Sequence, residues 1–121
     1  FGATSTSLAA RQARNVFNSM AARARAQAIE SGMTTVLLGS AAGDSVMILG
    51  QGGTIVENVR FAEELNVDIQ AATPTFRICM SPRGFADTNC NSFSSAFTVR
   101  FVAGNNTETI EILPLGQIRW E

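Results

Sequence analysis

Apolar residues occur with a helical period in the first quarter of the chain. Between residues 7 and 31 they recur at steps of three and four, so they share one face of a predicted helix. The residues on this face are Ala13, Val16, Phe17, Met20, Ala21, Ala24 and Ala28. Because most of them are alanine, and Phe17 and Met20 are the large exceptions, we expect another surface to approach this helix closely.

Both ends of this helix carry recognisable signals. Residues 1–6 are small and mostly polar, and we expect them to form a frayed start. Ser5, Thr6 or Ser7 can cap the helix through a hydroxyl oxygen. Gly32 suits the left-handed conformation that often ends a helix.

Beyond Gly32 the period shortens to two, which is typical of β-strands. Strands are predicted over residues 33–40, 45–50, 75–80, 96–102, 107–113 and 116–120, and over the less regular stretches 54–61 and 65–70. A tight turn at residues 103–106 joins two of these strands, and it predicts that Val99 lies opposite Ile110 and Phe97 opposite Ile112.

One helix followed only by consecutive strands predicts an α+β fold. We expect a single domain over residues 1–121, in which the helix 7–31 packs on antiparallel β-sheets formed within residues 33–120. The alanine-rich face fits this arrangement, since a sheet can lie close to small side chains.

Composition excludes most catalytic chemistry. The chain of 121 residues has no histidine and no tyrosine, and it therefore lacks the commonest general base and the commonest zinc ligand. The carboxylates Glu63, Glu64 and Asp68 have no nucleophile beside them in the sequence, and we expect them at a solvated strand edge. We expect no enzyme, no cofactor and no metal site.

Charge gives no general attraction to nucleic acid, because the net charge is −1. All nine cationic side chains are arginines. Arg11, Arg14 and Arg25 lie beside the apolar helix face. They form a phosphate-binding stripe, or else a solvated flank or contacts with neighbouring subunits, and the net charge disfavours the phosphate-binding stripe.

Cys79 and Cys90 bracket a turn-rich segment that contains Pro82, Gly84 and Asp87. Such a loop can bring two cysteines within bonding distance, and the alternative is a pair of free buried thiols. A disulfide would indicate an oxidising compartment such as a bacterial periplasm. Two cysteines without a histidine cannot complete a tetrahedral zinc site.

The stretch FNSMAARARAQAIESGMTTVLL, residues 17–38, resembles the segment that follows the membrane helix in FimT-like minor pilins and in GspH, the H-type pseudopilin of type II secretion. That family has an alanine-arginine-rich helix end, a glycine or small polar residue, and then a strand of valines and leucines. Pro82 and Gly84 match its late turn, and residues 98–120, TVRFVAGNNTETIEILPLGQIRW, are similar to its last strands.

The resemblance implies a pilin-like fold and a structural role in a type IV pilus or a type II secretion pseudopilus, with other pilins or pseudopilins as partners. It also implies an upstream leader, a methylated N-terminus and an apolar helix that anchors the domain on the periplasmic side of the bacterial inner membrane. The helix face that joins the filament would then be Ala13, Phe17, Met20 and Ala24.

DNA binding in natural transformation is the alternative function. Some FimT-like proteins that bind DNA have a Gly-Arg-x-Arg motif near the C-terminus. This chain has Gly116-Gln117-Ile118-Arg119 there, so one of the two arginines is absent. Arg100, Gly116 and Arg119 are the candidate contacts with DNA or with a protein partner.

Overall fold

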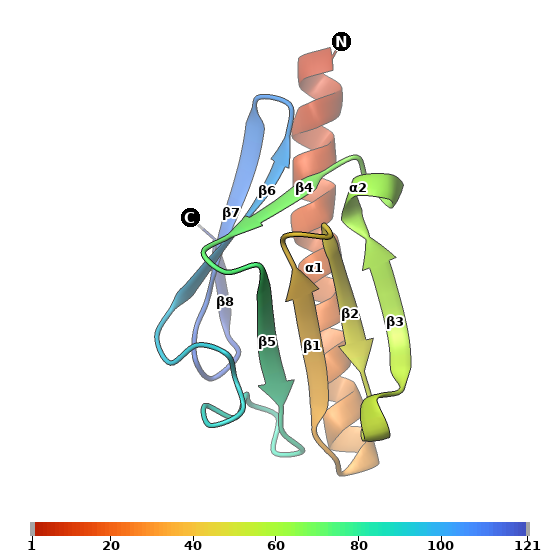
Figure 1. Ribbon diagram of the computed structural model, residues 1–121, viewed down its shortest axis with the longest axis vertical. Coiled ribbons are helices and arrows are strands. Elements are labelled where there is room, and N and C mark those ends of the chain that lie inside the picture. The colour runs from red at the N-terminus through yellow and green to blue at the C-terminus, as the bar shows by residue number, and fades with distance from the viewer. Residues whose placement is uncertain (1, 121) are drawn as a thin grey trace.

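One long helix and two four-stranded antiparallel sheets make up the fold (Figure 1). The computed structural model describes the backbone of residues 2–120 and the side chains of residues 6–120. This arrangement confirms the α+β fold in which an N-terminal helix packs on antiparallel sheets. None of the described helices is both long enough and apolar enough to span a membrane.

Helix α1 extends over Gly2–Ser31 and therefore begins earlier than predicted. The expectation of a frayed start is wrong for residues 2–6, and the candidate caps lie inside the helix. A tertiary contact accounts for the difference, because the Asn106 side-chain amide donates a hydrogen bond to the Thr6 hydroxyl. Gly104 also lies against Thr6, so the turn after β6 supports the start of the helix. At the other end, Gly32 has the expected positive φ of 70°.

The first sheet has the strand order β3-β2-β1-β5, and the second has the order β4-β6-β7-β8. Their bounds are β1 Thr35–Ser40, β2 Ser45–Leu49, β3 Ile55–Arg60, β4 Asp68–Ala71, β5 Thr75–Met80, β6 Phe97–Ala103, β7 Asn106–Ile112 and β8 Ile118–Trp120. Every predicted strand is therefore present. The β6–β7 hairpin has the predicted register, with Val99 opposite Ile110 and Phe97 opposite Ile112.

A short helix, α2 at Phe61–Glu64, replaces the end of a predicted strand. The Phe61 ring is fully buried and stacks on Phe101 at 5.8 Å between centroids. The Glu64 carboxylate accepts a hydrogen bond from the Arg60 N–H at 2.7 Å, which favours a helical turn here. The expectation that Glu63 and Glu64 lie on a strand edge is therefore wrong, because burial of Phe61 turns the chain out of the sheet.

Phenylalanine rings connect the helix to both sheets. The Phe17 centroid lies 6.2 Å from that of Phe76 in the first sheet and 5.7 Å from that of Phe101 in the second. Phe97 extends this group of phenylalanine rings, since its centroid is 5.3 Å from that of Phe76. Such tilted ring pairs are favourable beyond the area that they bury. The core is therefore one continuous cluster in which both sheets pack against the same side of α1.

Gly39 in β1 provides the first test of this core. A Cβ atom at Gly39 would lie 2.1 Å from the Phe76 ring, and Phe76 is held between Phe17 and Phe97. We expect Gly39→Ala to lower the free energy of unfolding by roughly 1–3 kcal/mol through overpacking. Urea unfolding measures the effect.

Gly43→Ala is the matched control, because its Cβ would lie 3.2 Å from the Ser40 hydroxyl and 3.7 Å from the Ser45 hydroxyl, a far smaller overlap than the one with Phe76 at Gly39. Equal stability of the two variants would contradict the packing of Phe76 over Gly39.

Candidate interaction surfaces

The proposed filament face of α1 is covered by the domain itself. Ala13, Phe17, Met20 and Ala24 each have 0% exposure and pack against the two sheets. A face that lies in the core cannot also contact a neighbouring subunit. The assignment of these four residues to the filament is therefore wrong, although the prediction that they share one buried face is confirmed.

The opposite side of α1 is open to solvent. A continuous stripe of exposed residues follows this side through seven positions spaced one to four residues apart. We call it the open face, and it consists of Leu8, Arg11, Gln12, Asn15, Ser19, Ala22 and Ala26. Its side chains are small or polar except for Leu8, which is 55% exposed. Small side chains allow a second helix to approach closely.

Two of the three arginines that we predict beside the apolar helix face contact the second sheet and are not solvated. Arg14 forms an ion pair with Glu108, and its guanidinium lies 4.0 Å from the centroid of the Trp120 ring. Arg25 donates a hydrogen bond from Nη2 to the Gly116 carbonyl at 3.3 Å. The expectation of a solvated flank is therefore wrong for Arg14 and Arg25, because β7 and the β7–β8 turn lie beside the helix. Of the three arginines predicted on this flank, Arg11 is the one that is exposed as expected.

Cys79 and Cys90 form the predicted disulfide, with their Cα atoms 5.8 Å apart. Cys79 points to the side of β5 away from α1, yet it is fully buried because the segment after β5 covers it. The alternative of two free thiols is excluded by this bond.

The segment between β5 and β6 closes the edge of the first sheet. The Asp87 N–H donates to the Cys79 carbonyl at 2.8 Å, and the Ser92 N–H donates to the Arg77 carbonyl at 3.0 Å. The Arg77 N–H donates in turn to the Ser92 hydroxyl at 2.8 Å. The backbone groups of β5 are thereby satisfied, and the strand offers no free edge there.

Asn91 links this segment to the second sheet. Its side-chain oxygen accepts the Cys79 N–H at 2.9 Å, and its side-chain amide donates to the Pro114 carbonyl at 2.8 Å. The Ala86 N–H also donates to the Leu115 carbonyl at 2.8 Å. Sequence reasoning missed Asn91, since a buried amide in a loop has no periodic pattern. The disulfide and Asn91 together join the two sheets at this end.

The three candidate contacts for DNA do not form one site. Arg100 and Arg119 both lie on the outer face of the second sheet, but Arg119 forms an ion pair with Glu111. Gly116 is buried in the β7–β8 turn against Met80 and Ala86, with a φ of 95°. The structure therefore separates Gly116 from the two arginines and neutralises one of them.

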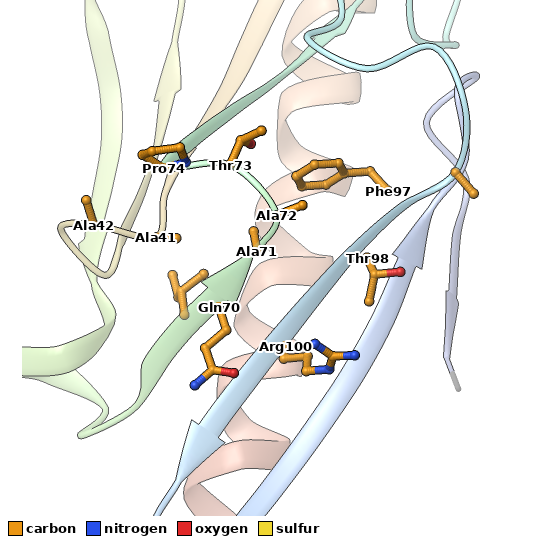
Figure 2. Close-up of a pocket in the computed structure, with 12 residues that line it drawn as sticks. Ala41, Ala42, Gln70, Ala71, Ala72, Thr73, Pro74, Phe97, Thr98 and Arg100 are labelled. Atoms are coloured by element: carbon orange, nitrogen blue, oxygen red, sulfur yellow. The ribbon is translucent and has the colours of Figure 1, made fainter.

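A shallow hollow lies where the β4–β5 connection meets the start of β6 (Figure 2). Its walls are alanines, Pro74 and Phe97, and its polar side chains include Gln70, Thr98 and Arg100. No carboxylate or cysteine lines it, so it contains no acid–base pair or thiol nucleophile. Arg100 is exposed, and no ion-pair partner is found for it among residues 6–120.

Removal of the disulfide should weaken the domain measurably. We expect Cys79→Ala with Cys90→Ser to lower the free energy of unfolding by roughly 2–4 kcal/mol, because the closed loop restricts the unfolded chain. Urea unfolding with and without reductant measures this difference. Alkylation of Cys79 or Cys90 in the native, unreduced protein would contradict the bond.

DNA binding should be weak and insensitive to Arg119, because Glu111 already pairs with this arginine. We expect Arg119→Ala to change the mobility shift of double-stranded DNA by less than about two-fold across a salt series. Arg83→Ala, an exposed arginine on the β5–β6 segment, is the control. Strong, salt-dependent retention that only Arg119→Ala abolishes would restore the DNA hypothesis.

Comparison with known proteins finds the same fold in two crystal structures. No protein-family model matches the sequence, and no curated protein matches it. A crystal structure of the Pseudomonas aeruginosa type IV minor pilin FimU aligns with a TM-score of 0.64 at 14% identity, covering 92% of this chain and 91% of that chain. FimU in a second crystal form aligns with a TM-score of 0.61 at 13% identity, covering 93% and 87%. The chain therefore has a minor pilin-like fold.

Proposed function

We propose that this chain is the globular domain of a minor pilin, a structural subunit of a bacterial type IV pilus. The observation that carries the proposal is the two-sided helix α1. One side is sealed by the two sheets, and the open face is a stripe of small and polar residues on the other side. A helix of this kind can pack against helices of neighbouring subunits without disturbing its own domain.

The similarity to FimU supports the pilus over the type II secretion pseudopilus, because both matching structures are type IV minor pilins. Because their sequence identity to this chain is low, the assignment to a pilus and not to a pseudopilus is itself part of the proposal. We also propose that an apolar helix upstream of Gly2 anchors the native protein in the inner membrane, with the domain on the periplasmic side. The disulfide fits that oxidising compartment.

The open face provides the test. Ala22 and Ala26 are exposed there, so a charged side chain at either position leaves the isolated domain intact. In a filament the same charge would be buried without a partner, which costs several kcal/mol. We expect Ala26→Glu in the full-length protein to reduce its amount in sheared filaments by at least about ten-fold. Immunoblotting of the filament fraction from the native host measures this amount.

Ala42→Glu is the matched control, because Ala42 is an exposed alanine in the β1–β2 turn and lies away from α1. Deletion of the gene should also reduce surface filaments while type II secretion continues at its normal rate. Normal incorporation of the Ala26→Glu protein into filaments would contradict the proposed packing, and loss of secretion without loss of filaments would assign the chain to a pseudopilus.

A further inference from the structure

Three large apolar side chains gather where the end of α1, the segment after β5 and the β7–β8 turn meet. These segments lie at the end of the domain opposite the N-terminus of α1 (Figure 1). Ile29 is 53% exposed, Phe85 43% and Leu115 50%. A Cβ atom at Gly84 would lie 3.4 Å from Ile29 Cδ1, and Gly84, Phe85 and Leu115 line one small hollow. We call these three residues the distal patch.

The backbone under the distal patch is rigid. The Ser81 N–H donates to the Phe85 carbonyl at 2.9 Å, and the Ala86 N–H donates to the Leu115 carbonyl at 2.8 Å. The disulfide closes the segment that carries Phe85. Exposed apolar side chains on a fixed backbone lose little entropy when a partner covers them, so they are effective contact residues.

Uncompensated positive charge surrounds the distal patch. Arg25 lines the hollow beside Phe85 and Leu115; it donates a hydrogen bond to the Gly116 carbonyl and has no ion pair among the side chains of residues 6–120. Arg83, two residues before Phe85, is exposed and has no ion pair among the described side chains. No carboxylate lines the hollow; Glu30 lines a different groove, between α1 and β3. Guanidinium groups favour carboxylates as partners.

We propose that the distal patch binds the globular domain of a different pilin, which presents an apolar side chain flanked by carboxylates. This inference rests on the proposed function. When α1 helices run parallel in a filament, the end of the domain that carries the distal patch faces the next subunit. The partner is recognised by burial of Phe85 and Leu115 and by pairing with Arg25 and Arg83.

A second copy of this chain fits the distal patch less well. In the α2–β4 region, toward the opposite end of the domain (Figure 1), Arg60 engages Glu63 and Glu64, whereas Asp68 is exposed without an ion pair among the described side chains. None of the exposed large apolar side chains of the described residues lies in α2, in β4 or between them. The Arg60 guanidinium lies 3.4 Å from the Glu63 carboxylate, and the Arg60 N–H donates to Glu64. In that region a second copy therefore lacks the apolar side chain flanked by carboxylates that the distal patch would bind, which favours a different subunit.

The probes are the soluble domains of the pilin-like proteins encoded beside this gene, each titrated against this domain by calorimetry. We expect one of them to bind, with Phe85→Ser weakening the affinity by at least about ten-fold. Arg83→Glu should weaken binding and reduce its dependence on salt. The matched controls are Ile55→Ser, which alters an even more exposed apolar residue on β3, and Arg100→Glu, which reverses an exposed arginine on the outer face of the second sheet.

Absence of binding by every probe, or equal binding by the Phe85→Ser and Ile55→Ser proteins, would overturn this inference. Self-association that Phe85→Ser abolishes in sedimentation equilibrium would also overturn it, because the occupant would be a second copy. Incorporation into filaments distinguishes failure of the proposed function from failure of the distal patch. There, normal incorporation of the Ala26→Glu protein refutes the filament role, whereas poor incorporation of Ala26→Glu with no effect of Phe85→Ser refutes the distal patch alone.

Discussion

The packing of Phe17 against both sheets is the contact on which the rest of the structure depends. Its ring meets Phe76 from the first sheet and Phe101 from the second, and no described strand pairing joins these two sheets. The helix must present small residues around Phe17, because larger ones would force the sheets apart. This requirement explains the alanines on the buried side of α1, while the other side stays open to solvent.

A second link between the sheets lies at the distal end of the domain. The disulfide holds the β5–β6 segment against β5, and Asn91 bonds this segment to the Pro114 carbonyl of the second sheet. Buried amides that satisfy backbone groups on both sides are costly to replace. The same segment positions Phe85 at the surface, so the link that stabilises the domain also supports the surface to which we assign a partner.

Alternation along the strands was enough to predict the hairpin register, because a buried face and a tight turn allow only one pairing of Val99 with Ile110. The helical period identifies an apolar face of α1 but not the surface that buries it, so the period alone does not distinguish a face that packs on its own domain from one that packs on another subunit. The partners of Arg14 lie about a hundred positions away, and no local pattern encodes such contacts. The predicted strand ends before Phe61, because burial of the Phe61 ring outweighs the local preference for a strand.

Methionine oxidation tests most directly whether the sheets seal one side of α1. Met20 is fully buried on that side and Met80 lies in the same core, whereas Met33 is 42% exposed just beyond the helix. Treatment of the native domain with dilute peroxide, followed by peptide mass spectrometry, gives the oxidation rate at each position. We predict rapid oxidation of Met33 and strong protection of Met20 and Met80. Oxidation of Met20 as fast as Met33 would show that this side of the helix is open, which contradicts the account.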